Sequence, residues 1–142
     1  MYTVVVAVTA DRGLEVARYV TTLAEDGREV EAIVVNVFEE FEVADEAGVV
    51  NSADLFEDVE PPEIVDAVTS DLESAGVDVT VRHEHGDPVT EIMRVAEEVD
   101  ADTIAVESRK RSPTGKAIFG STAQRLVLEA DRPVTVMTEP SD

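Results

Sequence analysis

The chain has 142 residues, of which 32 are acidic and 11 are basic, and its formal net charge is −21. This length suits one domain with a substantial core, and a hydrophobic content of 44% indicates a globular fold. The negative charge argues against binding DNA, RNA or an anionic membrane over any broad face, because like charges repel. The absence of cysteine excludes disulfides, thiolate catalysis and cysteine-based zinc sites.

The basic residues are mostly arginine, and Lys110 and Lys116 are the only lysines of the sequence. A highly acidic, lysine-poor surface is typical of adaptation to high salt, where screening over a few ångströms limits self-repulsion. The N-terminus lacks the basic start and apolar core of a signal peptide. No apolar run approaches the roughly 20 residues that span a bilayer. We therefore expect a cytoplasmic protein that does not enter a membrane.

Hydrophobic periodicity divides the chain into alternating strands and helices. Nearly continuous runs of β-branched and other apolar residues predict buried strands at residues 2–8, 30–37, 77–81, 103–106 and 134–137. Apolar stripes predict amphipathic helices at residues 13–24, 61–75, 88–99 and 121–130. Asp11 is a candidate N-cap for the first helix, and Asp87 followed by Pro88 is a strong start for the third.

Residues 38–60 differ from the rest of the chain. They hold nine acids and no Lys or Arg, with scattered apolar residues. We expect a long acidic connection within a single domain that covers residues 1–142, and this connection is either partly disordered or a lid near the end of the second strand.

The order of elements predicts a doubly wound α/β fold, with a parallel sheet between layers of helices. Ligands of such sheets bind at the carboxyl ends of the strands, where the strand order reverses. The segments after the first and fourth strands, at residues 9–12 and 107–119, are therefore the expected walls of a site.

The second of these segments carries an unusual charge pattern. No acid occurs from Ser108 to Leu128, whereas four basic residues lie within eight positions. This positive segment leads into a predicted helix start, which offers unpaired N–H groups and the positive end of a dipole. The pattern favours an anion site, and the alternative is a solvated basic loop that pairs with acidic neighbours. The four residues are Arg109, Lys110, Arg111 and Lys116.

Other motifs give weaker signals. Gly115-Lys116 fails the phosphate-loop pattern, because Lys110 stands where that pattern needs glycine and Ala117 where it needs Ser or Thr. His83 and His85 share one face of a strand, but the sequence places few further metal ligands near them, so a surface pair is the simpler interpretation. Ser108 and Ser121 have no histidine close in sequence to act as a base. We identify no catalytic constellation and no metal site.

Residues 106–121 resemble the nucleotide loop of the universal stress protein family, in which Gly, two residues, Gly, nine residues and Gly precede Ser or Thr. Glu107, Lys110, Gly120 and Ser121 fall on the motif positions. The resemblance extends to the opening strand, to residues 86–88 with the following helix, and to residues 101–106 and 132–136. Together with the acidic composition, it predicts a small single-domain member of the family from a halophilic archaeon.

The resemblance implies a five-stranded sheet in the order 3-2-1-4-5 with four helices, similar to adenine nucleotide hydrolases. It also implies a homodimer that forms through the last strand, where Val134 and Val136 are compatible with pairing. Members that bind ATP carry glycine at the positions of Glu107 and Lys110, and commonly Asp, which contacts ribose, at the position of Thr9. These departures make the motif degenerate, and a carboxylate at residue 107 would repel phosphate unless it is paired.

Two functional hypotheses follow. The first is a stress-response protein that binds an adenine nucleotide or another phosphate-bearing ligand, with ATP or AMP as the cofactor, Mg²⁺ if it is ATP, and at most slow ATP hydrolysis. The second is a dimeric scaffold or regulator that binds protein partners and no nucleotide. For the first, arginine and lysine side chains would replace backbone contacts to phosphate. The expected binding residues are Thr9, Val37, Val106, Arg109, Lys110, Arg111, Gly120, Ser121 and Thr122.

Overall fold

A computed structural model of the chain describes residues 1–8, 13–38, 42–45, 48–51, 63–108 and 120–137. Its centre is a five-stranded sheet in the order β5-β2-β1-β6-β7, and every neighbouring pair is parallel. The predicted doubly wound sheet and its 3-2-1-4-5 order are confirmed. The strands are β1 (Tyr2–Val8), β2 (Val30–Phe38), β5 (Asp78–His85), β6 (Thr103–Glu107) and β7 (Val134–Met137).

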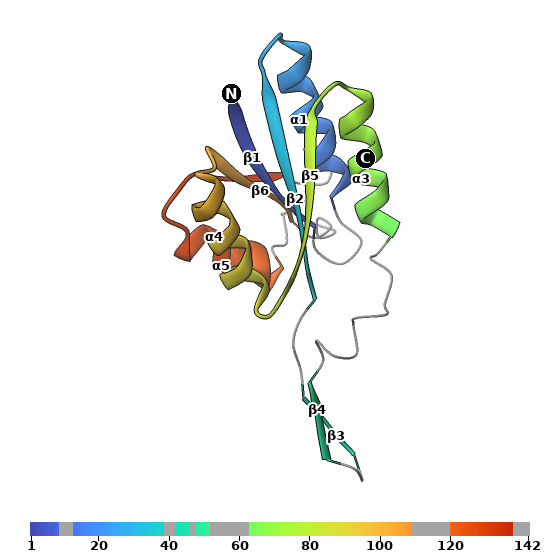
Figure 1. The fold of residues 1–142 in the computed structure, drawn as a ribbon. Coiled ribbons are helices and arrows are strands. Elements are labelled where there is room, and N and C mark those ends of the chain that lie inside the picture. The colour runs from blue at the N-terminus through green and yellow to red at the C-terminus, as the bar shows by residue number, and fades with distance from the viewer. Residues whose placement is uncertain (9–12, 39–41, 46–47, 52–62, 109–119, 138–142) are drawn as a thin grey trace, which may run out of the picture.

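Two pairs of helices cover the two faces of this sheet (Figure 1). One face packs against α1 (Leu14–Glu25) and α3 (Glu63–Ser74), and the other packs against α4 (Pro88–Val99) and α5 (Ser121–Glu129). Because side chains of a strand alternate between faces, Val4 and Val6 belong to the first core while Val5 and Ala7 belong to the second. The predicted helices are confirmed to within a few residues.

The edge strand β5 is longer than the predicted residues 77–81. It pairs with β2 as far as Phe38↔His85, although its last residues are polar. The predicted strand ended too early because it was defined by apolar residues alone. A strand at the edge of a sheet can carry polar residues that face solvent while its backbone continues to pair with its neighbour.

The acidic connection contains a feature that the sequence analysis missed. Residues Glu42–Asp45 (β3) and Gly48–Asn51 (β4) pair as an antiparallel ribbon, separate from the main sheet (Figure 1). The sequence analysis predicted no strand within this connection. Strands of four residues are too short for a clear alternating pattern, especially in a segment this rich in acids.

Candidate functional site

The strand order reverses between β1 and β6. These strands are neighbours through Val4↔Thr103, Val5↔Ile104 and Val6↔Ala105, yet the helices that follow them cover opposite faces of the sheet. Sheets of this kind usually bind a ligand at such a reversal, in the crevice outside the carboxyl ends of the two strands. The two helices that begin at this crevice are α1 and α5.

The start of α1 is occupied by a carboxylate from β6. The Oε1 atom of Glu107 accepts hydrogen bonds from the backbone N–H groups of Glu15, at 2.6 Å, and Val16, at 3.2 Å. Glu107 is 8% exposed, so two backbone N–H groups and the positive end of the helix dipole offset the cost of burying its charge. The N-cap residue itself is Gly13, which has no side chain for this purpose. The predicted cap, Asp11, lies outside the described residues.

The start of α5 is different. Its N-cap is Gly120, with extended backbone angles (φ −71°, ψ 164°) and no side-chain cap, and its first turn contains no acid. By contrast, α1, α3 and α4 each carry at least one acid in the first turn. The first N–H groups of an α-helix have no hydrogen-bond partner within the helix, and they lie at the positive end of the helix dipole. In α5, no carboxylate of the first turn competes with a ligand for these donors.

An ion pair fixes α5 to its neighbour. Arg125 donates from Nη1 to Oδ1 of Asp87, at 2.9 Å, and from Nε to Glu129 at 3.0 Å. Asp87 is the N-cap of α4, where its Oδ2 accepts from the N–H and hydroxyl of Thr90 at 3.0 and 2.8 Å. The hydrogen bond from Arg125, followed by those from Thr90, lowers the pKa of Asp87 from 3.8 to about 2. The first two turns of α5 are thereby held against the start of α4.

The remaining predicted site residues fall into two groups. Val37 is half-buried near the end of β2 and packs on the α4/α5 face, and Ser121 and Thr122 lie in the first turn of α5. Val106 is fully buried, so its side chain belongs to the core, and a ligand would meet at most its backbone. Four predicted residues lie outside the described parts of the chain, and their positions are not defined: Thr9, Arg109, Lys110 and Arg111.

The histidine pair lies in a small aromatic cluster on the α1/α3 face of the sheet edge. His83 Nδ1 lies 3.5 Å from the Asn36 side-chain nitrogen, and the rings of Phe38 and His85 stack with centroids 5.2 Å apart. Within the described residues, no group of three His, Asp or Glu side chains could hold a metal ion. None of the described helices is both long and apolar enough to cross a membrane.

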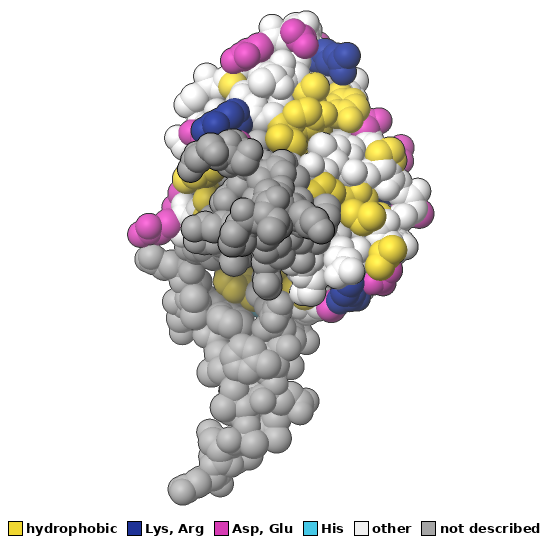
Figure 2. Space-filling view, turned by 180° about the vertical axis from the view of Figure 1, so that it is seen from behind, with side chains coloured by type: hydrophobic (Ala, Val, Ile, Leu, Met, Phe, Trp, Pro, Cys, Tyr) yellow, Lys and Arg dark blue, Asp and Glu magenta, His cyan; other side chains and the backbone are white. Residues whose placement is uncertain are grey.

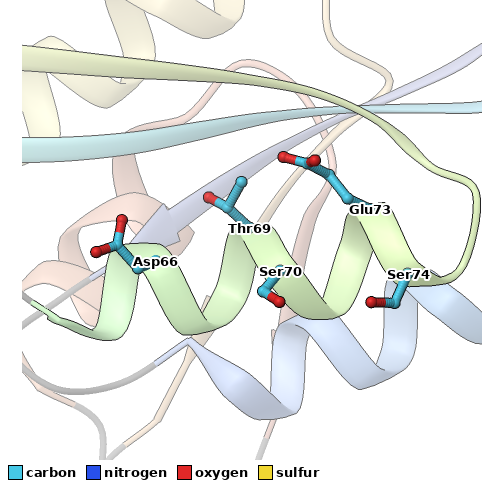
Figure 3. A pocket seen from close by; sticks show the side chains of 5 residues that line it. All are labelled: Asp66, Thr69, Ser70, Glu73 and Ser74. Carbon is cyan, nitrogen blue, oxygen red and sulfur yellow. The ribbon is translucent and has the colours of Figure 1, made fainter.

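A surface hollow on α3 is a poor candidate for the anion site. Every residue that lines it comes from this one helix, and the lining includes two carboxylates and no basic side chain (Figure 3). An anionic ligand would be repelled there. The hollow is lined by Asp66, Thr69, Ser70, Glu73 and Ser74.

Sequence reasoning missed two contacts at this end of the sheet, that of Glu107 with α1 and the Arg125–Asp87 pair. Glu107 was expected to face a ligand phosphate, whereas its carboxylate lies on the α1 side of the sheet and α5 packs on the other side. The only available signal was the alternation of β6, in which Ala105 packs toward α1 while Ile104 and Val106 pack toward α4 and α5. The Arg125–Asp87 pair had no local signal, because 38 positions separate the two residues.

Comparisons with known proteins identify the family. The sequence profile of the Universal stress protein family matches residues 1–138. A universal stress protein of Mycolicibacterium smegmatis is 37% identical over 68 residues, which are 47% of this chain and 52% of that protein. The chain thus spans about half the length of this curated relative.

Solved structures agree with this match. The structure of a universal stress protein from Archaeoglobus fulgidus has a TM-score of 0.69 and 31% identity, covering 96% of this chain and 97% of that one. Another structure, of the universal stress protein from Archaeoglobus fulgidus in complex with dAMP, has a TM-score of 0.64 and 26% identity, with 96% of each chain covered. Because the family profile matches almost the whole sequence, the chain belongs to the universal stress protein family.

Proposed function

We propose that the protein is a cytoplasmic stress-response protein that binds an adenine nucleotide or another phosphate-bearing ligand at the start of α5. The observation that carries this proposal is the α5 start itself, which has a glycine N-cap and no acid in its first turn, at the carboxyl edge of the sheet. The N–H groups of Gly120, Ser121 and Thr122 are suitable donors for phosphate oxygens. A relative that is 26% identical was solved in complex with dAMP, which supports an adenine nucleotide.

Charge supports the same assignment. In this proposal Arg109, Lys110 and Arg111 lie near the phosphate and supply charge-assisted hydrogen bonds in place of the glycines of the family motif. Glu107 does not oppose this arrangement strongly, because its carboxylate is paired with two N–H groups on the α1 side of the sheet. Val37 would lie beside the base, Val106 at the strand end, and Thr9 near the sugar.

Binding rather than catalysis is the activity that we propose. In this proposal any hydrolysis of ATP would be slow and would use Mg²⁺ that arrives with the nucleotide. We further propose that residues 1–142 form a single domain.

Mass spectrometry of ligand retained through purification, followed by calorimetric titration with AMP and ATP in molar KCl, tests the assignment of a nucleotide site. If neither nucleotide nor phosphate binds at millimolar concentration, the nucleotide proposal fails.

A homodimer through β7 is the second part of the proposal. The strand β7 lies at the end of the sheet order, and the carbonyl groups of Pro133 and Met137 accept from β6. Along a strand, the backbone groups of successive residues point alternately to its two sides. The N–H and C=O groups of Val134 and Val136 therefore point away from β6, toward the edge of the sheet. These groups could pair with a second copy of the strand.

The surface beside this edge is also suited to an interface. Val127 and Leu128 of α5 are exposed, Leu128 at 77%, and hydrophobic side chains lie uncovered between charged ones on the side of the molecule drawn in Figure 2. Such a surface also supports the alternative function, a dimeric scaffold or regulator for partner proteins without a nucleotide. The calorimetric titration above separates the two functions, because a scaffold would bind neither AMP nor ATP.

A further inference from the structure

A single side chain from another strand holds the start of α1. Glu107, at the end of β6, holds the N–H groups of Glu15 and Val16 with one carboxylate oxygen, across a sequence separation of 92 positions for the first. This contact is almost fully shielded, since Glu107 is 8% exposed.

The N-cap position itself is poorly suited to this task. A Cβ atom at the N-cap Gly13 would lie 2.9 Å from Cγ2 of Val68 in α3, closer than real Cβ contacts allow. The usual capping residues Ser, Thr, Asp and Asn would therefore fit at that position only if the Val68 side chain moved. The close contact of Gly13 with Val68 thus disfavours a capping side chain at the N-cap, and Glu107 of β6 supplies an acceptor for the first turn of α1.

We propose that Glu107 is a tethered anion that fills the α1 start and excludes a ligand anion from that side of the crevice. A phosphate group seeks the same donors, the N–H groups of a helix start at the positive end of its dipole. Two anions cannot share these donors at hydrogen-bond distance, because their repulsion is strong where water is scarce. A free phosphate loses translational and rotational entropy when it binds, whereas the carboxylate of Glu107 is already attached to the protein. The carboxylate therefore competes more strongly for these donors.

This proposal concerns α1 and stands independently of ligand binding at α5. Its consequence is that, of the two described helix starts at the strand order reversal, the start of α1 does not accept a ligand anion, which leaves the start of α5. Glu107 is then the residue that determines where an anion can bind.

The test follows backbone amide resonances of ¹⁵N-labelled protein during titration with inorganic phosphate, at constant ionic strength in KCl. In the parent protein, the Glu15 and Val16 amides should not move. In Glu107→Ala, both amides lose their acceptor and should shift saturably with phosphate, with affinity about tenfold or more above the parent. Glu107→Gln is the matched control, because its side-chain oxygen still accepts from both amides. As in the parent, its Glu15 and Val16 amides should not shift when phosphate is added.

Ser121 and Thr122 report separately on the proposed function. If the α5 start binds phosphate, their amides shift in all three proteins, and if it does not, they stay in place without any effect on the Glu15 and Val16 result. Equal phosphate shifts at Glu15 and Val16 in the parent and in Glu107→Ala would overturn the tethered-anion proposal, as would their absence in Glu107→Ala.

A direct comparison covers the case in which Glu107→Ala does not fold. The Glu15 amide proton of the parent should resonate downfield and exchange slowly, because it donates to a charged acceptor. In Glu107→Gln the acceptor is neutral, so this proton should move upfield. An unchanged Glu15 resonance would show that the carboxylate does not hold the helix start.

Discussion

The guanidinium group of Arg125 in α5 lies 2.9 Å from the Asp87 carboxylate that caps α4. This contact joins the two helices that cover one face of the sheet, near the proposed anion position. Asp87 has two tasks, since it also accepts from the Thr90 N–H, whereas Arg125 contributes only ion pairs.

The two residues should therefore differ in their effect on stability. Asp87→Ala removes the cap and the ion pair and should lower the free energy of unfolding by about 1–2 kcal/mol. Arg125→Ala removes only exposed ion pairs, which are screened by solvent, and should lower the free energy of unfolding less than Asp87→Ala does. Urea denaturation in molar KCl measures both, and Asp87→Asn, which keeps an acceptor for Thr90, should resemble Arg125→Ala. A larger cost for Arg125→Ala than for Asp87→Ala would contradict the assignment of the two tasks.

The same carboxylate predicts a pH dependence. Hydrogen bonds from Arg125 and Thr90 lower the pKa of Asp87 from 3.8 to about 2 in the folded protein. The folded state therefore favours the ionised form, and the associated stability is present above the unfolded pKa and is lost as the pH falls from 3.8 toward about 2. The stability difference between the parent and Asp87→Asn should shrink over this interval. Its size is modest, because the pair is partly exposed to solvent. A difference that grows on acidification would contradict the prediction.

Low salt should destabilise the fold. Arg94 bridges Glu84 and Glu91 at 3.0 Å, but the 11 basic residues of the sequence cannot neutralise its 32 acids. Repulsion between the unpaired carboxylates extends over longer distances as the ionic strength falls. Thermal unfolding should have a clearly lower midpoint in millimolar than in molar KCl. Equal midpoints would remove the interpretation of the composition as an adaptation to high salt.

The open edge of β7 allows a direct test of the dimer. Val136→Pro removes an N–H group that the register turns away from β6, so the sheet within one subunit keeps its own ladder. The variant should elute as a monomer in size-exclusion chromatography in molar KCl. Val136→Ala retains the N–H group and should remain dimeric. Persistence of the dimer in Val136→Pro would place the interface elsewhere.

The strands and helices of the main fold could be predicted because their signals are local. Residues 2–8 are apolar at every position except Thr3, as expected of a strand buried on both faces, and Asp87-Pro88 is a local signal for the start of a helix. The order of strands came from the family resemblance and not from these local patterns.

The candidate site was less predictable, because its contacts join distant segments. The sequence indicates that a carboxylate stands at residue 107, but its partners lie 92 and 91 positions earlier, in the first turn of α1. Local patterns do not contain such a contact. The basic residues Arg109, Lys110 and Arg111 remain predictions, since they lie outside the described residues.

The central claim is that the start of α5, with its glycine N-cap, binds a phosphate-bearing ligand, and Gly120 is the position at which to test it. Its extended backbone angles are those of an ordinary N-cap, so Gly120→Asp should place a carboxylate on the first N–H groups of the helix. This change should raise the thermal midpoint of the ligand-free protein while it blocks the anion. A loss of binding accompanied by a gain in stability cannot be explained by misfolding.

The decisive measurement is the calorimetric affinity for AMP in molar KCl, for the parent and for Gly120→Asp, with Gly120→Asn as the uncharged control. We predict that the parent binds AMP, that Gly120→Asn binds more weakly, and that Gly120→Asp loses about tenfold or more in affinity, because it adds a negative charge at the phosphate position. Equal affinity of the parent and Gly120→Asp for AMP, or no binding by the parent at millimolar AMP, would contradict the proposed site.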